Sequence, residues 1–495
     1  MNTSSPAAVG GERTSHEDMV VLRWLVVATF IVILNETIMA NAIPRLAADF
    51  SVSLRTAQWL TTAFMLAMAI VIPVTGWFLQ RVTTRQAFAL AMTVFCAGTL
   101  IAACAPWFWL LIVGRVVQAS GTAVMMPLLM TTLMSLVPES DRGRVMGNVT
   151  LAMSVAPALG PAVSGVILQS LSWRWMFGIV LPLAALIGVL GLRRMRNVGQ
   201  RTTASVDALS IVMSGLGFGA AVYGLSLLGD HSAPVNPWVL IGGGVVMIVL
   251  FVLRQLQLQR VGSPLLDLRT LKHRTYTLSL LLMVFAFMGF LGSMILVPLY
   301  LQSARGLSVL ETGLMMMPGG LAMGLLGPRV GKIFDARGGR VLVIPGSVGV
   351  VIALAIFSQI NLHTPYWLIL VAHIVLMSSL AAVFTPVFTL GLGSVPPQLY
   401  SHASSLLGAL QQVAGAVGTA VSVTVMATVA HFDQRNPITL THGLERAFLV
   451  SAIVSVLVVV LAILLPARLP GGQLDGEVDD LVEGPAGALE EFVSP

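Results

Sequence analysis

The chain has 495 residues, of which 56% are hydrophobic and 10% are charged, and its mean hydropathy is +0.91. This balance excludes a soluble globular domain and predicts an all-α polytopic membrane protein. The net charge of +6 could suggest a nucleic-acid binder, but the basic residues are scattered in short runs between apolar segments. Such scattering is typical of signals for membrane topology, so we expect no nucleic-acid partner.

Residues 1–19 are polar and carry both charge signs, without the apolar core and cleavage site of a secretory signal. We therefore expect the first apolar segment to remain as a membrane span. The two cysteines, Cys96 and Cys104, are eight residues apart in one apolar segment. At helical rise that is about 12 Å, which is too far for a disulfide. No spacing is typical of a metal site, and we expect neither a metal nor another cofactor.

Fourteen apolar segments are long enough to cross about 30 Å of hydrocarbon. A segment that crosses lipid must satisfy its own backbone hydrogen bonds, so we expect it to be helical. We therefore predict fourteen membrane-spanning helices joined by short polar connections. Their expected limits are 20–43, 57–79, 87–105, 107–137, 145–171, 175–192, 206–229, 237–256, 275–303, 310–333, 341–358, 366–393, 402–430 and 444–465.

The positions of Arg and Lys predict the orientation, because loops rich in these residues stay in the cytoplasm. With the N-terminus inside, nineteen of them fall on the cytoplasmic side and six outside. We therefore expect a multi-pass protein of the inner cell membrane, in contact with membrane lipids, with both termini in the cytoplasm. The acidic tail after Pro466 has no sizeable apolar face, and we expect it to be disordered.

A repeated segment indicates that the chain contains two related halves. GKIFDARGGR at 331–340 and GWFLQRVTTR at 76–85, 255 residues apart, share Gly at the first position and Arg at the tenth. At the fifth and eighth positions, Gln80 and Thr83 stand in place of Asp335 and Gly338. Each copy falls in the second predicted cytoplasmic loop of a six-helix set, which favours duplication. The expected domains are a cytoplasmic segment 1–19, a first half 20–198, a two-helix insert with linker 199–262, a second half 263–466 and a cytoplasmic tail 467–495.

Several motifs resemble those of one transporter family. LIVGRVVQASGTA at 111–123 and APALGPAVSG at 156–165 resemble the fourth-span signature and the fifth-span antiporter signature of the major facilitator superfamily. SWRWMF at 172–177 and PLLDLRTLKHRTY at 264–276 resemble segments of its fourteen-span drug:proton antiporter branch. The resemblance covers about residues 20–465. It implies two pseudo-symmetric six-helix halves that rock about a midplane cavity and export small amphipathic compounds in exchange for protons.

The opening span resembles the first-span signature of this branch in the form found in lincomycin-type and related multidrug exporters. In LNETIMANAIP at 34–44, Asn35 occupies the usual acidic position and Glu36 follows it. The first loop motif departs from the family, because Gln80 and Thr83 replace its Asp and Gly, so no gating acid is implied at position 80. The resemblance implies gating roles for Pro157, Gly160, Pro161 and Gly165 in the antiporter motif and for Gly331, Asp335, Gly338 and Arg340 in the second loop motif.

These motifs have structural alternatives. Gly160 and Pro161 could bend a helix and admit a close neighbour without any gating function. Asp335 and Arg340 could be a helix cap with topological charge.

Glu36 and Arg115 are the ionisable residues that we expect to couple transport to protons. At 1.5 Å per residue, both should lie roughly 10–12 Å below the outer membrane surface. A charge at that depth is costly and marks a pathway or proton relay by default. The alternative is a static ion pair that holds the first and fourth spans together.

We place the substrate cavity on spans of both halves. The first half is expected to contribute Asn35, Gln58, Thr61, Gln118 and Met125, and the second half Tyr300, Gln302, Met316, Gln411 and Gln412. Five histidines lie at predicted loop or span ends, where we expect them to be solvated: His231, His363, His402, His431 and His442. His373 lies inside a span, where we expect helix packing.

The sequence thus favours a monomeric, proton-driven exporter of small amphipathic compounds such as antibiotics. No paired nucleophile and base, phosphate-binding loop or metal cluster favours an enzyme or direct use of ATP. A transporter of one specific metabolite with the same fold stays open, because fold does not fix function. A channel or a membrane receptor is a weaker alternative.

Overall fold

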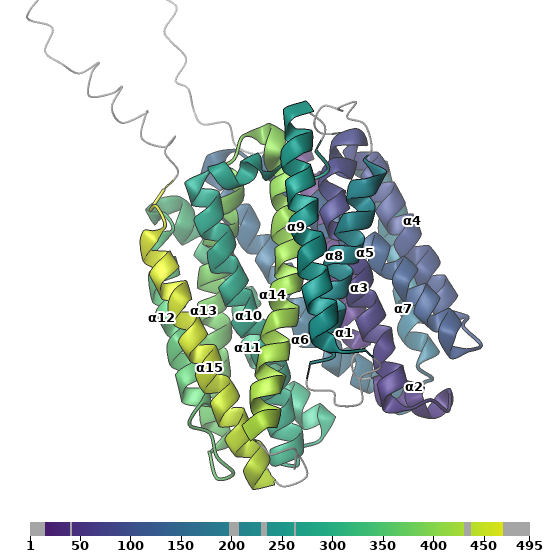
Figure 1. Cartoon of the computed structure of the whole chain (residues 1–495), viewed down its shortest axis with the longest axis vertical. Helices are drawn as coiled ribbons and strands as arrows, with labels where there is room; N and C mark the ends of the chain where they lie inside the picture. The colour runs from purple at the N-terminus through teal and green to yellow at the C-terminus, as the bar shows by residue number, and fades with distance from the viewer. Residues whose placement is uncertain are drawn as a thin grey trace, which may run out of the picture.

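The computed structural model describes residues 15–39, 42–197, 207–228, 235–261, 264–429 and 437–468. Within these ranges the chain is all-helical, with fifteen α-helices and no strand (Figure 1). The helices are α1 (His16–Ile38), α2 (Ile43–Asp49), α3 (Leu54–Arg81), α4 (Thr84–Ala103), α5 (Phe108–Leu136), α6 (Arg142–Ser170), α7 (Arg174–Arg194), α8 (Ala208–Ser226), α9 (Pro237–Val261), α10 (Arg274–Leu299), α11 (Val309–Arg337), α12 (Arg340–Phe357), α13 (Tyr366–Gly393), α14 (Tyr400–Val429) and α15 (Pro437–Leu464).

The helix lengths confirm a polytopic membrane protein. Twelve helices of the described ranges are long and apolar enough to cross a membrane. Helices α1 and α6 are not among these twelve, and α2 has only 7 residues. The predicted number of fourteen spans therefore stays a prediction. Most of the acidic tail, residues 469–495, lies outside the described residues, as does the linker before α8.

Short polar side chains begin several helices at the change from loop to apolar run. Thr83 and Ser308 each accept a hydrogen bond from the backbone N–H three residues later, and the side chains of Gln86 and Glu311 return a bond to the cap residue. These capping boxes satisfy backbone donors that a helix start leaves free. Thr83, which departs from the glycine of the loop motif, therefore starts α4.

The first helix differs from its prediction at its outer end. The expected span was 20–43, but α1 begins at His16 and ends at Ile38. The short helix α2 then begins at Ile43 with Pro44 in its first turn, where a missing N–H is tolerated. The predicted end of the first span at residue 43 was wrong. Glu36 therefore lies in the last turn of α1.

The long helices pack as two groups of six. In the first group, α1 contacts α5, α6 and α7, α3 contacts α5, and α4 contacts α5 and α7. In the second group, α10 contacts α13, α14 and α15, while α12 contacts α13 and α15. Figure 1 shows α12, α13 and α15 on one side of the bundle and α4 and α7 on the other. The exact domain limits predicted from the sequence stay a prediction.

The two groups meet along two main lines of contact, which we call seams. The α6–α11 seam joins α6 to α11, and the α3–α14 seam joins α3 to α14. Helix α14 also contacts α5, and α13 contacts α6. The substrate path expected from the sequence would run between these helices.

Helices α8 and α9 form a hairpin between the two groups, at the front of Figure 1. They approach closely, since a Cβ on Gly244 of α9 would lie 2.6 Å from the backbone nitrogen of Ala221 in α8. Helix α8 contacts both α3 and α14, and Phe218 and Val222 on α8 are buried in a small apolar cluster with residues of those helices. The pair therefore covers the α3–α14 seam.

Candidate functional site

A fully buried guanidinium lies at the centre of the first helix group. Arg115 on α5 is 1% exposed. It donates to the side-chain oxygen of Gln118 at 2.5 Å and to that of Asn35 on α1 at 3.3 Å. Its Nε reaches the carbonyl oxygen of Leu60 on α3 at 3.5 Å, and its Cζ lies 4.0 Å from the ring centre of Phe64. Neutral acceptors and an aromatic face thus surround the charge and offset its desolvation.

Gln118 connects this cluster to α4. Its amide nitrogen donates to the hydroxyl of Thr99 at 2.7 Å, and Thr99 donates to the carbonyl oxygen of Phe95. The helices can approach so closely because a Cβ on Gly98 would overlap the backbone of Gln118, and one on Gly114 would lie 2.8 Å from Ala102 nitrogen. The amide oxygen of Gln118 accepts from Arg115 while its amide nitrogen donates to Thr99, so the side chain holds its oxygen towards Arg115.

Glu36 follows Asn35 and is partly buried. Its carboxylate and the Arg115 guanidinium attract each other electrostatically. Among the described residues, however, the ion pairs within 4 Å do not include this pair. Arg115 therefore influences Glu36 through space, while its hydrogen bonds go to the amide groups of Asn35, Gln118 and Leu60. The role of Glu36 in proton coupling stays a prediction.

The predicted antiporter motif lies against the residue next to Glu36. The hydroxyl of Thr37 reaches the carbonyl oxygen of Ala156 on α6 at 3.4 Å, and a Cβ on Gly160 would lie 2.5 Å from that hydroxyl. Gly160 is therefore needed for α6 to contact α1 beside Glu36. A Cβ on Gly165 would meet no atom within 4 Å. Helix α6 runs through Pro157 and Pro161 without a break, and the gating role of the motif stays a prediction.

The other predicted cavity residues of the first group lie in different surroundings. Gln58 is exposed near the start of α3, and Met125 is buried at 1% exposure in the main core. The hydroxyl oxygen of Thr61 is buried without a hydrogen-bond partner. Thr61 is one turn from Phe64 on the same helix, so of these three it is the polar group best placed beside the Arg115 cluster.

The cavity residues predicted from the second group do not gather in one cluster. Tyr300 is 1% exposed and donates from its hydroxyl to the carbonyl oxygen of Asn361 at 2.7 Å, so it anchors the α12–α13 turn. Gln302 lies with it in one π-helical turn, Tyr300–Ala304. Gln412 on α14 reaches the sulfur of Met68 on α3 at 3.8 Å, across the seam. Met316 and Gln411 are partly buried on α11 and α14. Their role in a cavity stays a prediction.

The second loop motif joins the two groups. The carboxylate of Asp335 on α11 accepts hydrogen bonds from the backbone N–H groups of Gly143 and Arg144, both at 2.8 Å. These groups belong to the first turn of α6, where a helix binds negative charge well. A Cβ on Gly331 would overlap the carbonyl oxygen of Gly143. Asp335 and Gly331 therefore hold α11 directly on α6.

The remaining residues of this motif fix the end of α15. Gly338 has a φ of 80° and ends α11, a conformation that favours glycine. The neighbouring Gly339 donates to the carbonyl oxygen of Ala467 at 2.8 Å. Arg340 donates to the carbonyl oxygen of Ile463 at 2.7 Å. Capping is thus one role of this motif, as the structural alternative expected.

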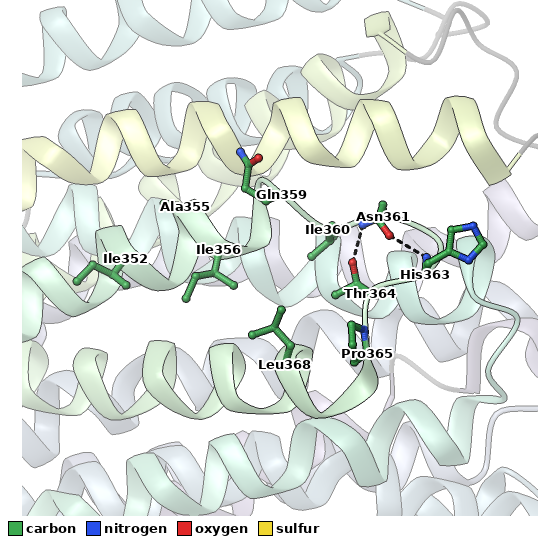
Figure 2. Close-up of a pocket in the computed structure, with 10 residues that line it drawn as sticks. All are labelled: Ile352, Ala355, Ile356, Gln359, Ile360, Asn361, His363, Thr364, Pro365 and Leu368. Atoms are coloured by element: carbon green, nitrogen blue, oxygen red, sulfur yellow. Dashed lines mark hydrogen bonds between the residues drawn. The ribbon is translucent and has the colours of Figure 1, made fainter.

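A pocket of about 700 Å³ lies at the turn between α12 and α13, and Figure 2 shows the residues that line it. Apolar side chains of the two helices line it, and Asn361 and Thr364 form its polar end, where Thr364 accepts from the backbone N–H of Asn361 at 2.8 Å. All of its lining residues belong to the second helix group. It is therefore separate from the cluster around Arg115.

Sequence reasoning missed three participants. Thr99 and Phe64 complete the surroundings of Arg115. Phe64 follows Thr61 by one helical turn on α3, which could have suggested it, whereas Thr99 lies on a different helix from Arg115 and had no such signal. His402 was expected to be solvated, but it is 3% exposed. That expectation was wrong because α3 covers the ring: a Cβ on Gly76 would lie 3.0 Å from its Nδ1.

The fold is thus a bundle of two groups of six long helices, with the buried Arg115 cluster inside the first group. The sequence model of the Major Facilitator Superfamily matches residues 25–419. The chain therefore belongs to the major facilitator superfamily, which makes it a transporter rather than an enzyme. This confirms the resemblance recognised from the motifs.

Curated relatives include named resistance proteins. The chain is 39% identical over 458 residues to the lincomycin resistance protein LmrB of Listeria innocua, covering 90% of this chain and 96% of the relative. It is 36% identical over 442 residues to LmrB of Bacillus subtilis, covering 87% and 92%. It is 29% identical over 408 residues to the putative multidrug resistance protein MdtD of Salmonella heidelberg, covering 81% and 84%.

Solved structures share the fold. The proton:xylose symporter XylE matches with a TM-score of 0.65 at 15% identity, covering 92% of this chain and 97% of that one. The human organic anion transporter MFSD10 matches with a TM-score of 0.63 at 14% identity, covering 90% and 99%. At such identities the likeness shows the fold alone.

Proposed function

We propose that this protein exports small amphipathic compounds, antibiotics among them, across the cytoplasmic membrane in exchange for protons. The names of its LmrB and MdtD relatives support the substrate class. The observation that carries proton coupling is the carboxylate of Glu36 beside the buried Arg115 cluster, on helices of one group. The proton gradient supplies the energy, without another cofactor.

The cluster gives a physical reason for exchange. Burial in a helix bundle disfavours the charged carboxylate of Glu36, while the guanidinium of Arg115 favours it. A cationic or polar substrate that approaches Glu36 acts in the same sense as Arg115 and displaces a proton. Proton and substrate thus compete for one site. Gln118 and Asn35 keep Arg115 in place while the charge of Glu36 changes.

We also propose which side of the membrane the structure is closed to. Four hydrogen bonds that join the two groups lie towards the loops that carry Asp335 and Gln80, which the distribution of Arg and Lys assigns to the cytoplasm. They are Gly143–Asp335, Gln80–Gln398, Thr131–Ser404 and Thr150–Thr385. On this assignment both termini are cytoplasmic and the structure is closed on the cytoplasmic side. Rocking about the two seams would open that side.

The test is transport by the purified protein in lipid vesicles with an imposed pH difference and no ATP. We expect Glu36→Gln to fold and insert but to lose proton-driven efflux, and Glu36→Asp to retain part of it. Proton release on substrate binding should vanish in the Gln variant. The matched control is Glu311→Gln, which makes the same chemical change at an exposed capping box where Gln also serves.

Three results would overturn the proposal. A Glu36→Gln variant with wild-type efflux and an unchanged pH profile would make Glu36 a structural residue. Efflux that requires ATP and proceeds without an ion gradient would contradict proton antiport. Transport of one metabolite, with no response to lipophilic cations or neutral antibiotics, would identify a specific transporter with the same fold.

A further inference from the structure

Residues 264–273, which precede α10 and which we call the linker, are fixed in place, although the proposed proton site does not use them. The side-chain oxygen of Gln255 on α9 accepts hydrogen bonds from the backbone N–H groups of Leu265 and Leu266, at 2.8 and 3.2 Å. The amide nitrogen of Gln255 donates to the hydroxyl of Ser210 on α8 at 2.7 Å. The buried Gln255 thus ties the start of this linker to the α8–α9 hairpin.

The linker holds a negative charge against the second helix group. Asp267 is 3% exposed and accepts from the backbone N–H of Arg269 at 2.9 Å and from its guanidinium at 2.5 Å. Burial by itself would raise the pKa of Asp267, but the hydrogen bonds and charge of Arg269 hold that pKa below its usual value. Asp267 is therefore a carboxylate at neutral pH.

The charge of Asp267 acts on a buried histidine at the α3–α14 seam. His402 lies in the first turn of α14, and its Nδ1 is buried without a hydrogen-bond partner. Asp267 attracts a proton on this ring and Arg269 repels it. Across the seam, the backbone of α3 at Gly76 covers Nδ1. The ring is thus between a charged linker and the backbone of α3, whose last turn carries Arg81 over the ring of Trp77.

Other elements near the first turns of α14 present mainly uncharged groups. Tyr276 on α10 donates to the carbonyl oxygen of Ala403 at 2.7 Å. Thr75 of α3 and Thr131 of α5 contact serines of α14. Arg142 donates to the carbonyl oxygens of Val137 and Met134, and on α14 it reaches the hydroxyl of Tyr400 at 3.4 Å. The electrostatic influences on the ring of His402 are therefore those of Asp267 and Arg269.

A proton on His402 fits the open seam better than the closed one. In the closed seam an imidazolium would place an Nδ1–H donor against α3 with no acceptor, which costs desolvation energy. Opening removes α3 from the ring and admits water. Asp267 would remain beside the ring, because the linker contacts α10 and α14 of the same group.

We propose that His402 is a second proton-binding group of this transporter, which takes up a proton when the α3–α14 seam opens and releases it on closing. This inference rests on the proposed alternating access. Asp267 is a positioning residue that favours the charged ring. Acidification of the cytoplasm then holds the seam open and slows the return to the closed state.

The experiment measures the seam directly, by distances between spin labels at positions 85 and 398, which are exposed on opposite sides of it. The full chain carries Cys96→Ser and Cys104→Ser to remove native thiols, and Glu36→Gln to remove the first proton site. Between pH 8 and pH 5, we expect the population with the longer distance to rise on acidification. His402→Gln should abolish this response, and Asp267→Asn should shift its midpoint to lower pH.

Two further variants keep the test decisive. In Gly76→Ala, the added Cβ would lie 3.0 Å from Nδ1 and 3.2 Å from the backbone of His402, which weakens the closed seam while the histidine is retained. The midpoint of the pH-dependent opening should therefore move to higher pH. His363→Gln, at the exposed α12–α13 turn, should respond like the parent. No pH response in the parent, or an unchanged response in His402→Gln, overturns the proposal. The readout needs neither substrate nor proton gradient, so it is independent of the vesicle test for Glu36.

Discussion

The two seams between the helix groups are built from different contacts. On the α6–α11 seam, backbone lies directly on backbone, because a Cβ on Gly147 would overlap the carbonyl oxygen of Gly327 and one on Gly331 would overlap that of Gly143. On the α3–α14 seam, side chains fill the space: His402 covers Gly76, and Thr75 donates to Ser405 at 3.3 Å. The first seam has no room for rearrangement, whereas side chains can repack on the second.

The repeated loop motif contributes a different polar group to each seam. Asp335 meets the first turn of α6, which offers backbone N–H donors. Gln80, at the matching position, donates from its amide to the carbonyl oxygen of Gln398 at 2.9 Å. Pro396 and Pro397, which lie just before α14, have no N–H to offer. A carboxylate suits the backbone N–H groups of α6, and an amide donor suits the carbonyl oxygen of Gln398. The difference between Asp335 and Gln80 therefore follows from the groups that they contact.

The largest effect is expected from a methyl group on the α6–α11 seam. In Gly331→Ala, the Cβ has no space beside the carbonyl oxygen of Gly143, so the closed seam should lose about 3 kcal/mol, roughly a hundredfold in population. Spin labels at exposed positions 148 and 332 should report opening, and efflux should fall accordingly. Gly243→Ala on α9, where a Cβ meets no atom within 4 Å, is the control. Equal behaviour of the two variants would contradict a backbone-packed seam.

A smaller effect is expected from the charge on the same seam. Asp335→Asn keeps the shape but loses the anion that accepts two backbone N–H bonds at 2.8 Å. Hydrogen bonds to charged groups are worth about 1.5–3 kcal/mol, so the closed population should fall by about tenfold or more. The same pair of labels measures it. If Asn closed the seam as well as Asp, the helix N-terminus would have no preference for charge.

Replacing the amide by a carboxylate on the α3–α14 seam should destabilise the closed state less than the Asp335→Asn change does on the α6–α11 seam. Gln80→Glu places a carboxylate where an amide nitrogen now donates to the carbonyl oxygen of Gln398. The lost hydrogen bond and the repulsion at this exposed site should weaken the α3–α14 seam by about 1 kcal/mol. Labels at positions 85 and 398 should show a modest opening, with no change at the α6–α11 seam. A tighter seam in the Glu variant would show that backbone donors are available there after all.

The sequence indicated the residues of the buried Arg115 cluster because they are chemically out of place. Glu36, Arg115 and Gln118 are polar in long apolar segments, where the cost of burial makes such residues informative. The structure brings Arg115 and Gln118 together with Asn35. Fold class and family were likewise predictable, from apolar segment lengths and motif spacing.

Other features depend on contacts between distant segments and left no local signal. His402 sits at the start of its helix, where a sequence pattern indicates solvent, yet α3 buries it from about 330 residues away in the chain. The hydrogen bond from the hydroxyl of Tyr300 to the carbonyl oxygen of Asn361, 61 residues further along the chain, could likewise not be predicted. The end of α1 at Ile38 was missed because the apolar run continues beyond it.

The smallest expected effect concerns the α8–α9 hairpin, which contacts the α3–α14 seam. Hydrogen bonds from Arg254 hold the pKa of Asp207 at about 2, below its ordinary value of 3.8. A lowered carboxyl pKa adds stability that is fully present above about pH 4 and is lost as the pH falls towards 2. Because the pair is partly solvated, we expect under about 1 kcal/mol.

Asp207→Asn should therefore lower the midpoint of thermal unfolding by about 1 °C at pH 7. The difference from the wild type should disappear as the pH approaches 2, and it should shrink in high salt because solvent ions screen the pair. Since α8 packs on α3 and α14, any change in label distance should occur between positions 85 and 398. An equal change between positions 148 and 332 would mean that the hairpin stabilises both seams. The α6–α11 and α3–α14 seams would then differ only in the contacts between their own helices.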